Sequence, residues 1–303
     1  MEKTKNKSAF LTKTLEIFKK IGRGIKIFFT KMYSNKKSAI GFSIILLYVI
    51  VAIVGPLLFP YDSTVNTANK YLAPSLEHPF GTDWMGLDVF RQVISGTSSV
   101  LQVAFFTAFL SIALGTVLGI LSGYVGGWVD RVIMTIVNIF LSVPSFPVYL
   151  MMAALFTIET PITMALMISI FSWAGLCRAI RVQVISLKES DFIQICRVMN
   201  MSTGHIIFKE IMPNLFSYIA VNFVLILRGS ILASVGIMLV GLASYNPTDW
   251  GVIIQAARMR GLMNVNNVII MLYPLVAILI FQIAALMLSQ GLDETINPRL
   301  KVL

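Results

Sequence analysis

Long stretches without a charged residue constrain this chain more than any other feature of its sequence. A helix needs roughly 20 mostly apolar residues to cross a hydrocarbon core about 30 Å thick, because each residue adds about 1.5 Å. Five runs qualify without a charge, and a sixth is interrupted only by Arg228. The six runs are 39–59, 98–124, 132–158, 160–177, 215–243 and 268–292. None alternates apolar and polar residues with a period of two, so they predict membrane-spanning helices rather than barrel strands.

The overall composition agrees with a chain that resides in a bilayer. Hydrophobic residues make up 57% of it and charged residues 13%, whereas ordinary soluble domains hold about 45–50% and about 25%. The two cysteines, Cys177 and Cys196, indicate neither a disulfide framework nor a metal motif. We predict an all-α membrane protein with six transmembrane helices and no cofactor.

The lysines and arginines predict how the chain is oriented in the membrane. Six spans place both termini on one side, and 19 of the 24 Lys and Arg residues then fall in the terminal and inner segments. Because cytoplasmic segments carry the excess of positive charge, both termini are predicted to be cytoplasmic. The net charge of +10 follows from the same asymmetry, and we expect no nucleic-acid partner.

Three parts are expected along the chain. Residues 1–37 form a cytoplasmic basic segment, in which 10–32 have the spacing of an amphipathic helix on the anionic inner leaflet; a solvated tail is the alternative. Residues 38–97 hold the first transmembrane helix and an ordered extracytoplasmic loop rich in turn-forming residues. Residues 98–303 form a five-helix core that includes a cytoplasmic loop at 184–214.

Chemistry typical of common enzyme classes is missing from the sequence. A nucleotide-hydrolysing P-loop needs the pattern G-x-x-x-x-G-K-S/T, which does not occur in the chain. The two histidines, His78 and His205, fall on opposite sides of the predicted membrane, so they cannot share a metal or serve one catalytic site. Enzymatic activity is therefore not expected.

Two features within the spans invite a functional interpretation. Arg228 lies near the middle of its run, roughly 20 Å from either end, too far for its side chain to reach the headgroups fully. We expect it to meet anionic substrate groups in a water-filled pathway or to pair at a subunit interface. Pro144 and Pro147 should kink the third helix, which then lines a pathway or is accommodated by its neighbours.

The segment at 191–213, DFIQICRVMNMSTGHIIFKEIMP, is too polar to cross a bilayer. Its spacing predicts a short two-faced helix, a break at 200–204 and a second short helix ending at Pro213. A free face of such a helix can bind in a groove of a partner; the alternative is a loop resting on the inner leaflet. The apolar positions are Phe192, Ile195, Cys196 and Met199, and the polar ones are Asp191, Gln194 and Arg197.

This segment resembles the signature cytoplasmic loop of bacterial ABC importer permeases. That loop reads E-A-A-x-x-x-G, followed about a dozen residues later by L-P-N. Here Gln194 to Asn200 stand in its place and replace the Glu, both Ala and the Gly, while Pro213 and Asn214 match the later Pro-Asn pair.

Four further segments are similar to the C-type subunit of oligopeptide and dipeptide permeases. They are HPFGTDWMGLDVFRQVISG at 78–96, GYVGGWVDRVIM at 123–134, NPTDWGVIIQAAR at 246–258 and GLDETINPRLK at 291–301. The first departs from the family pattern at Leu87 and Phe90. Pro144 agrees with the family, and Asn138 takes the place of its usual aspartate.

The resemblance implies the type I ABC importer permease fold in a bacterial inner membrane. It also implies a second homologous permease chain as heterodimer partner, two ATP-binding subunits, an extracytoplasmic substrate-binding protein and surrounding membrane lipid. The residues that would couple to an ATPase are Asp191, Gln194, Ile195, Cys196, Arg197, Met199, Asn200 and Pro213. Arg228, Pro144 and Asn138 are candidates for the pathway or an interface.

One departure from the family loop has a structural consequence. Asn200 lacks the backbone freedom of the glycine it replaces, so the turn either has another geometry or holds an asparagine in the left-handed conformation.

The function implied is a permease subunit of an ATP-driven importer of oligopeptides or dipeptides, which couples ATPase closure to alternating access. A permease for another small solute, such as a nickel chelate, is the first alternative. A stand-alone channel or secondary transporter and a structural membrane scaffold are the others.

Overall fold

The computed structural model describes residues 33, 35–243 and 246–296, and its regular secondary structure over these ranges is helical. The amphipathic helix predicted at 10–32 lies outside the described residues. Five helices are long and apolar enough to cross a membrane, or six if a bent pair counts as one span, so the all-helical membrane fold is confirmed. The five are α2 (Lys36–Leu58), α3 (Val89–Val125), α6 (Pro161–Lys188), the continuous α8–α9 helix (Thr203–Leu239) and α11 (Val265–Ile296).

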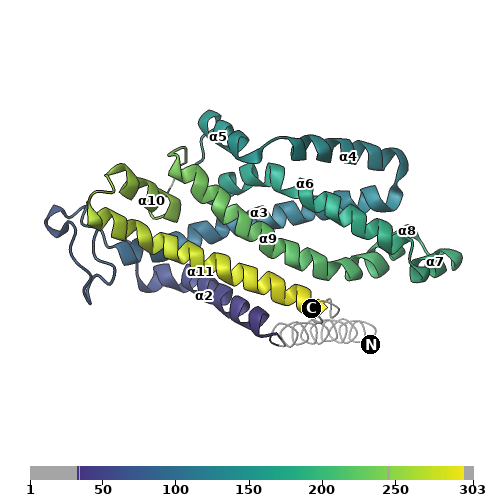
Figure 1. Ribbon diagram of the computed structural model, residues 1–303, viewed down its shortest axis with the longest axis horizontal. Coiled ribbons are helices and arrows are strands. Elements are labelled where there is room, and N and C mark those ends of the chain that lie inside the picture. The colour runs from purple at the N-terminus through teal and green to yellow at the C-terminus, as the bar shows by residue number, and fades with distance from the viewer. Residues whose placement is uncertain (1–32, 34, 244–245, 297–303) are drawn as a thin grey trace, which may run out of the picture.

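The helices run antiparallel in an elongated bundle (Figure 1). At one end lie α7 (Asp191–Val198), the start of α2 and the end of α11, where Lys37 and Glu294 form a 2.7 Å ion pair. We call this the α7 end. The opposite, loop end carries the connection from 59 to 88 and the short helix α10 (Trp250–Met259).

Small residues allow α3 and α6 to approach closely at the centre of the bundle. Gly115, Gly119 and Gly123 repeat every four residues along α3 and lie against α6. A Cβ atom on Gly119 would lie 2.8 Å from the carbonyl oxygen of Cys177. Membrane helices gain most of their association energy from such close packing, because lipid removes the hydrophobic drive to associate.

The third predicted span is broken rather than kinked. Its residues form α4 (Gly127–Ser142) and α5 (Ser145–Leu155), which are bent by 82° relative to one another. Val143 is extended, as expected for a residue before proline, and Pro144 begins the turn into α5. The predicted disruption by proline is confirmed. The prediction of a single helix over 132–158 is wrong.

Two spans begin or end well beyond their uncharged runs. Helix α3 begins at Val89 because the Asp88 side chain accepts a 3.0 Å hydrogen bond from the backbone N–H of Arg91. Residues 89–97, which were expected in the extracytoplasmic loop, are therefore helical. Helix α6 continues to Lys188, eleven residues past the uncharged run.

The loop end is ordered around a buried carboxylate. Asp83 accepts hydrogen bonds from the backbone N–H groups of Met85 at 2.7 Å and Leu87 at 3.0 Å, and from the Gln92 side chain at 2.8 Å. The indole N–H of buried Trp250 donates to the Val93 carbonyl at 3.0 Å, which fixes α10 against α3. Helix α10 was not predicted, since its ten residues are too few to give a span signal.

The close approach of α2 and α11 leads to a test of stability. A Cβ atom on Gly41 would lie 2.4 Å from the Ala284 carbonyl oxygen, so Gly41→Ala must push the helices apart. We expect it to lower the free energy of unfolding by about 1–3 kcal/mol. Gly175→Ala on α6 is the control, since its Cβ would meet nothing within 4 Å. Thermal unfolding in detergent measures both, and equal midpoints would contradict the packing described.

Candidate functional site

Helix α7 is held to the bundle by one narrow face. Ile193 and Cys196 are buried in an apolar cluster with Ile206, Ile211 and Leu215. The Gln194 side-chain amide also donates to the Lys188 carbonyl at 3.1 Å. Cys196, one of the residues that the resemblance assigns to ATPase coupling, is buried in its own bundle. Ile193 was missed, because the stripe through 192, 195, 196 and 199 has equally good helical spacing.

Outside this narrow face α7 is exposed and carries several large apolar side chains. Ile195 is 58% exposed, Met199 65% and Val198 87%, and Phe192 is also exposed. The polar residues Asp191, Gln194 and Arg197 are exposed beside them. Burial of apolar surface is worth about 25 cal/mol per Å², and a continuous exposed apolar patch commonly marks an interaction site.

Asn200 ends α7 in the left-handed conformation, with φ +55°. Its backbone N–H donates to the Arg197 carbonyl at 2.9 Å, and that of Met201 donates to the Cys196 carbonyl at 3.1 Å. These two bonds form a Schellman motif, in which Met201 packs back on the cluster that holds Cys196. One of the two predicted geometries is thus observed, and the turn survives replacement of the family's glycine by asparagine.

The prediction of a second short helix that ends at Pro213 is wrong. Ser202 caps α8 (Thr203–His205), which continues through the π-helix η2 (Ile206–Ile211) into α9 (Met212–Leu239). The N–H of Met212 bonds to the Ile207 carbonyl, five residues back, so the register shifts just before Pro213, which has no N–H to donate. The helix can therefore run on into the membrane.

Polar contacts tie α7 and its surroundings to three long helices. Lys188 Nζ donates to the Tyr124 carbonyl at 2.7 Å, and the Arg197 guanidinium lies 5.8 Å from the Tyr124 ring centre. Asp130 on α4 accepts two hydrogen bonds from Arg181 on α6, at 2.5 and 2.6 Å. Sequence reasoning missed this ion pair, since its partners lie 51 residues apart and no local pattern joins them.

The remaining candidates lie elsewhere. Asn138 on α4 accepts a 2.6 Å hydrogen bond from Arg178 on α6, and Pro144 is exposed at the break after α4. Arg228 Nε donates to the Gln282 side-chain oxygen at 2.6 Å, and the Gln282 amide donates back to the Arg228 carbonyl at 3.1 Å. Gln282 was missed because it is a neutral side chain 54 residues away, which no local pattern connects to Arg228.

The Arg228–Gln282 pair leaves part of the guanidinium available. Only its Nε bonds to Gln282, and no described residue forms a hydrogen bond or ion pair with its two terminal nitrogens. Gln282 thus orients the group without neutralising its charge.

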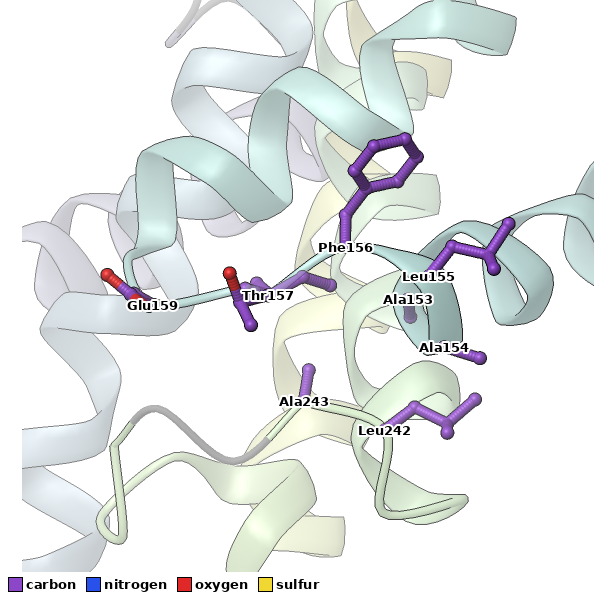
Figure 2. A pocket seen from close by; sticks show the side chains of 9 residues that line it. Ala153, Ala154, Leu155, Phe156, Thr157, Glu159, Leu242 and Ala243 are labelled. Carbon is purple, nitrogen blue, oxygen red and sulfur yellow. The ribbon is translucent and has the colours of Figure 1, made fainter.

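A cavity of about 490 Å³ opens at the loop end between the segment after α5 and the segment after α9 (Figure 2). Phe156, Thr157 and Glu159 line one side, and Leu242 and Ala243 the other; Glu159 carries the negative charge of the lining. Among the residues that the structure describes, no cluster of His, Cys, Asp and Glu could hold a metal ion. The bundle has an exposed apolar surface on α7 at one end and a cavity at the other.

Within the described residues, five long apolar helices in one bundle, or six with the bent pair, define a multi-pass membrane protein. Residues 115–302 match the family described as binding-protein-dependent transport system inner membrane component. Residues 25–74 match the N-terminal transmembrane domain of oligopeptide transport permease C. The chain belongs to this family, the ABC importer permeases, and to their C type.

Curated relatives agree over nearly the whole chain. The dipeptide transport system permease protein DppC of Alkalihalophilus pseudofirmus is 32% identical over 90% of this chain and 89% of its own. The metal-staphylopine import system permease protein CntC of Staphylococcus aureus is 35% identical over 90% and 94%. The glutathione transport system permease protein GsiD of Shigella flexneri is 31% identical over 85% and 84%.

The Schellman motif predicts how substitutions at Asn200 behave. Valine at φ +55° should cost about 1–2 kcal/mol and raise amide exchange at Met201 about tenfold, whereas glycine should keep the turn. Hydrogen exchange of Asn200→Val and Asn200→Gly, read by mass spectrometry, tests this. Equal exchange in the two variants would rule out a structural need for the left-handed residue.

Proposed function

We propose that this chain is the permease subunit of an ATP-driven importer of dipeptides and oligopeptides, forming half of the translocation pathway. The observation that carries the proposal is the exposed apolar face of α7, which is fixed to the bundle on its other side. An apolar helix face of this kind is suited to a groove of an ATP-binding subunit. Asp191, Gln194 and Arg197 would border the contact.

Two structural links would carry motion from α7 to the pathway. Arg197 links α7 to Tyr124 on α3, and Lys188 links α3 to α6. Arg181 links α6 to Asp130 on α4, so a displacement of α7 would reach these helices in turn. The uninterrupted helix from Thr203 to Leu239 leads from the docking face to Arg228 in the membrane. ATPase closure would thereby shift the bundle between inward-open and outward-open states.

The proposed assembly contains a second homologous permease chain, two ATP-binding subunits and an extracytoplasmic substrate-binding protein. It would lie in a bacterial inner membrane with the α7 end and both termini in the cytoplasm. The excess of Lys and Arg in the segments at the α7 end supports this orientation. The substrate-binding protein would then dock at the loop end, beside the cavity that Glu159 lines.

Peptides are the favoured substrates, since relatives of this chain are named for dipeptide and glutathione transport. The second candidate is another small solute such as a metal chelate, which is favoured by the relative named for metal-staphylopine import. In either case Arg228 would meet anionic groups of the cargo through its terminal nitrogens.

Docking of a partner on the exposed face of α7 can be tested by introducing one negative charge there. Ile195→Asp places a carboxylate at the centre of the exposed apolar face, and burying it against a partner is costly. We expect peptide uptake and substrate-stimulated ATP hydrolysis to be lost while membrane insertion persists, with Ile195→Leu as the active control. Normal uptake by the Asp variant would refute docking at this face.

The role of Arg228 can be separated from its structural contact. Hydrogen bonds to charged groups are worth about 1.5–3 kcal/mol, so Arg228→Gln should slow uptake of acidic peptides about tenfold relative to neutral ones. Gln282→Glu should have the same effect, because it neutralises the guanidinium and keeps an acceptor for Arg228 Nε, while losing the donor to the Arg228 carbonyl. Equal shifts for acidic and neutral peptides would make Arg228 a purely structural residue.

A further inference from the structure

An apolar groove lies between α2 and α11 in the half of the bundle nearer the loop end. Its volume is about 650 Å³, and Val93, Thr97 and Trp250 form a buried floor. The walls are half-buried and exposed side chains, and the exposed ones include Leu47 on α2 and Val276 on α11. Because the chain crosses a membrane, a groove with this floor and these walls opens toward hydrocarbon.

The groove results from how α2 packs. Near the α7 end the two helices touch through Gly41 and Gly291, where any added Cβ would meet the opposite backbone within 2.4 Å. Farther along, the facing residues are large, and Tyr48 is the bridge, donating to the Ala277 carbonyl at 2.7 Å. Beyond this bridge the side chains do not fill the space between the helices.

The lining offers almost nothing to a polar ligand. The Tyr48 hydroxyl, the Thr97 hydroxyl and the Trp250 indole N–H all donate to backbone carbonyls of this chain. A peptide in this groove would leave its own amide groups unpaired, at a cost of several kcal/mol each. An alkyl chain has no such groups, and pockets of roughly 300–1,000 Å³ hold small ligands.

We propose that the groove binds one acyl chain of a membrane phospholipid as a resident ligand of the outer leaflet. Its α11 wall runs from Leu272 to Ile280, about 12 Å, close to the roughly 15 Å depth of one hydrocarbon leaflet. An aromatic group of Phe59, Phe80 and Phe90 lies at the outer end, the level at which aromatic residues meet headgroups.

A cation stands where the lipid phosphate would lie. The Arg91 side chain follows Phe90 on α3 and is 42% exposed. Its Nε lies 3.8 Å from an Asp88 carboxylate oxygen, and one terminal nitrogen donates to the Pro60 carbonyl at 3.5 Å, which leaves the other terminal nitrogen for a phosphate. A guanidinium at this level suits a phosphate group. The lipid would fill the space between the first transmembrane helix and the core. This inference depends on the membrane fold, and its placement in the outer leaflet depends on the proposed orientation, but neither depends on the transported substrate.

Fluorescence of Trp250 reports occupancy of the groove. A variant with Trp84, Trp128 and Trp173 replaced by Phe keeps Trp250 as its single tryptophan. The protein, purified with the subunits that accompany it, is placed in nanodiscs of phosphatidylcholine brominated midway along the acyl chain. The emission of the same complex with Trp250 also replaced by Phe is subtracted, which removes the contribution of tryptophans in the accompanying subunits. Because Trp250 lies buried in the floor, only a chain inside the groove should quench it.

Ala277→Phe fills the groove, and Leu279→Phe, on the same helix but outside the lining, is the matched control. If the new ring displaces about two methylenes of the acyl chain, the affinity of the groove for the lipid falls roughly tenfold. Quenching of Trp250 should therefore be lost in Ala277→Phe and kept in Leu279→Phe. Native mass spectrometry of the protein with all four tryptophans should show a retained phospholipid that only Ala277→Phe loses. Should Ala277→Phe misfold, Val51→Phe fills the groove from the opposite wall.

Three results would overturn the proposal. An unquenched Trp250 without the filling substitution would mean that another chain covers the groove or that it stays empty. Equal quenching in Ala277→Phe and Leu279→Phe would mean that lipid reaches Trp250 by another route. A protein that releases every phospholipid on mild delipidation would hold no resident lipid.

Discussion

Hydrocarbon offers no hydrogen-bond partner to a peptide group, and the architecture of this chain follows from that constraint. Every described span is helical, and two features that would disturb a helix in lipid come with a compensation. The register shift before Pro213 lets a helix continue past a residue that cannot donate. One neutral side chain, Gln282, forms hydrogen bonds with both the Nε and the backbone carbonyl of Arg228. At Pro144 the helix instead breaks and turns by 82°.

The same constraint explains why α7 stands out. It lies outside the long apolar spans, where water could satisfy its polar groups, yet its outward face is apolar. Its own hydrogen bonds are closed internally by the Schellman motif at Asn200, and its inner face is anchored by Ile193 and Cys196. A small rigid helix with an unused apolar face is well built to receive force from another protein. The contacts through Tyr124 and Asp130 would pass that force to the spans.

Much of this could be predicted from the sequence, for physical reasons that differ between elements. The uncharged runs located the spans because the cost of burying charge in lipid acts on every residue of a run. Their ends were placed less well, since capping by Asp88 and the extension of α6 depend on local contacts rather than hydropathy. Proline disruption at Pro144 and the left-handed Asn200 were foreseeable from backbone sterics.

What could not be predicted depends on residues far apart in the chain. The Arg181–Asp130 and Arg228–Gln282 pairs join different helices, and the inward direction of Cys196 depends on the surface beneath α7. The short helix α10 is fixed by Trp250 reaching a carbonyl 157 residues away. Such contacts have no periodicity for a single sequence to display.

The central claim is that a motor in other polypeptides acts on α7, and that this chain turns the resulting motion into opening of a pathway. The most direct measurement is labelled-peptide uptake into liposomes that hold either the complete complex or this chain alone, with and without ATP. The account predicts uptake only by the complete complex and only with ATP. Uptake or ATP hydrolysis by this chain alone would contradict it.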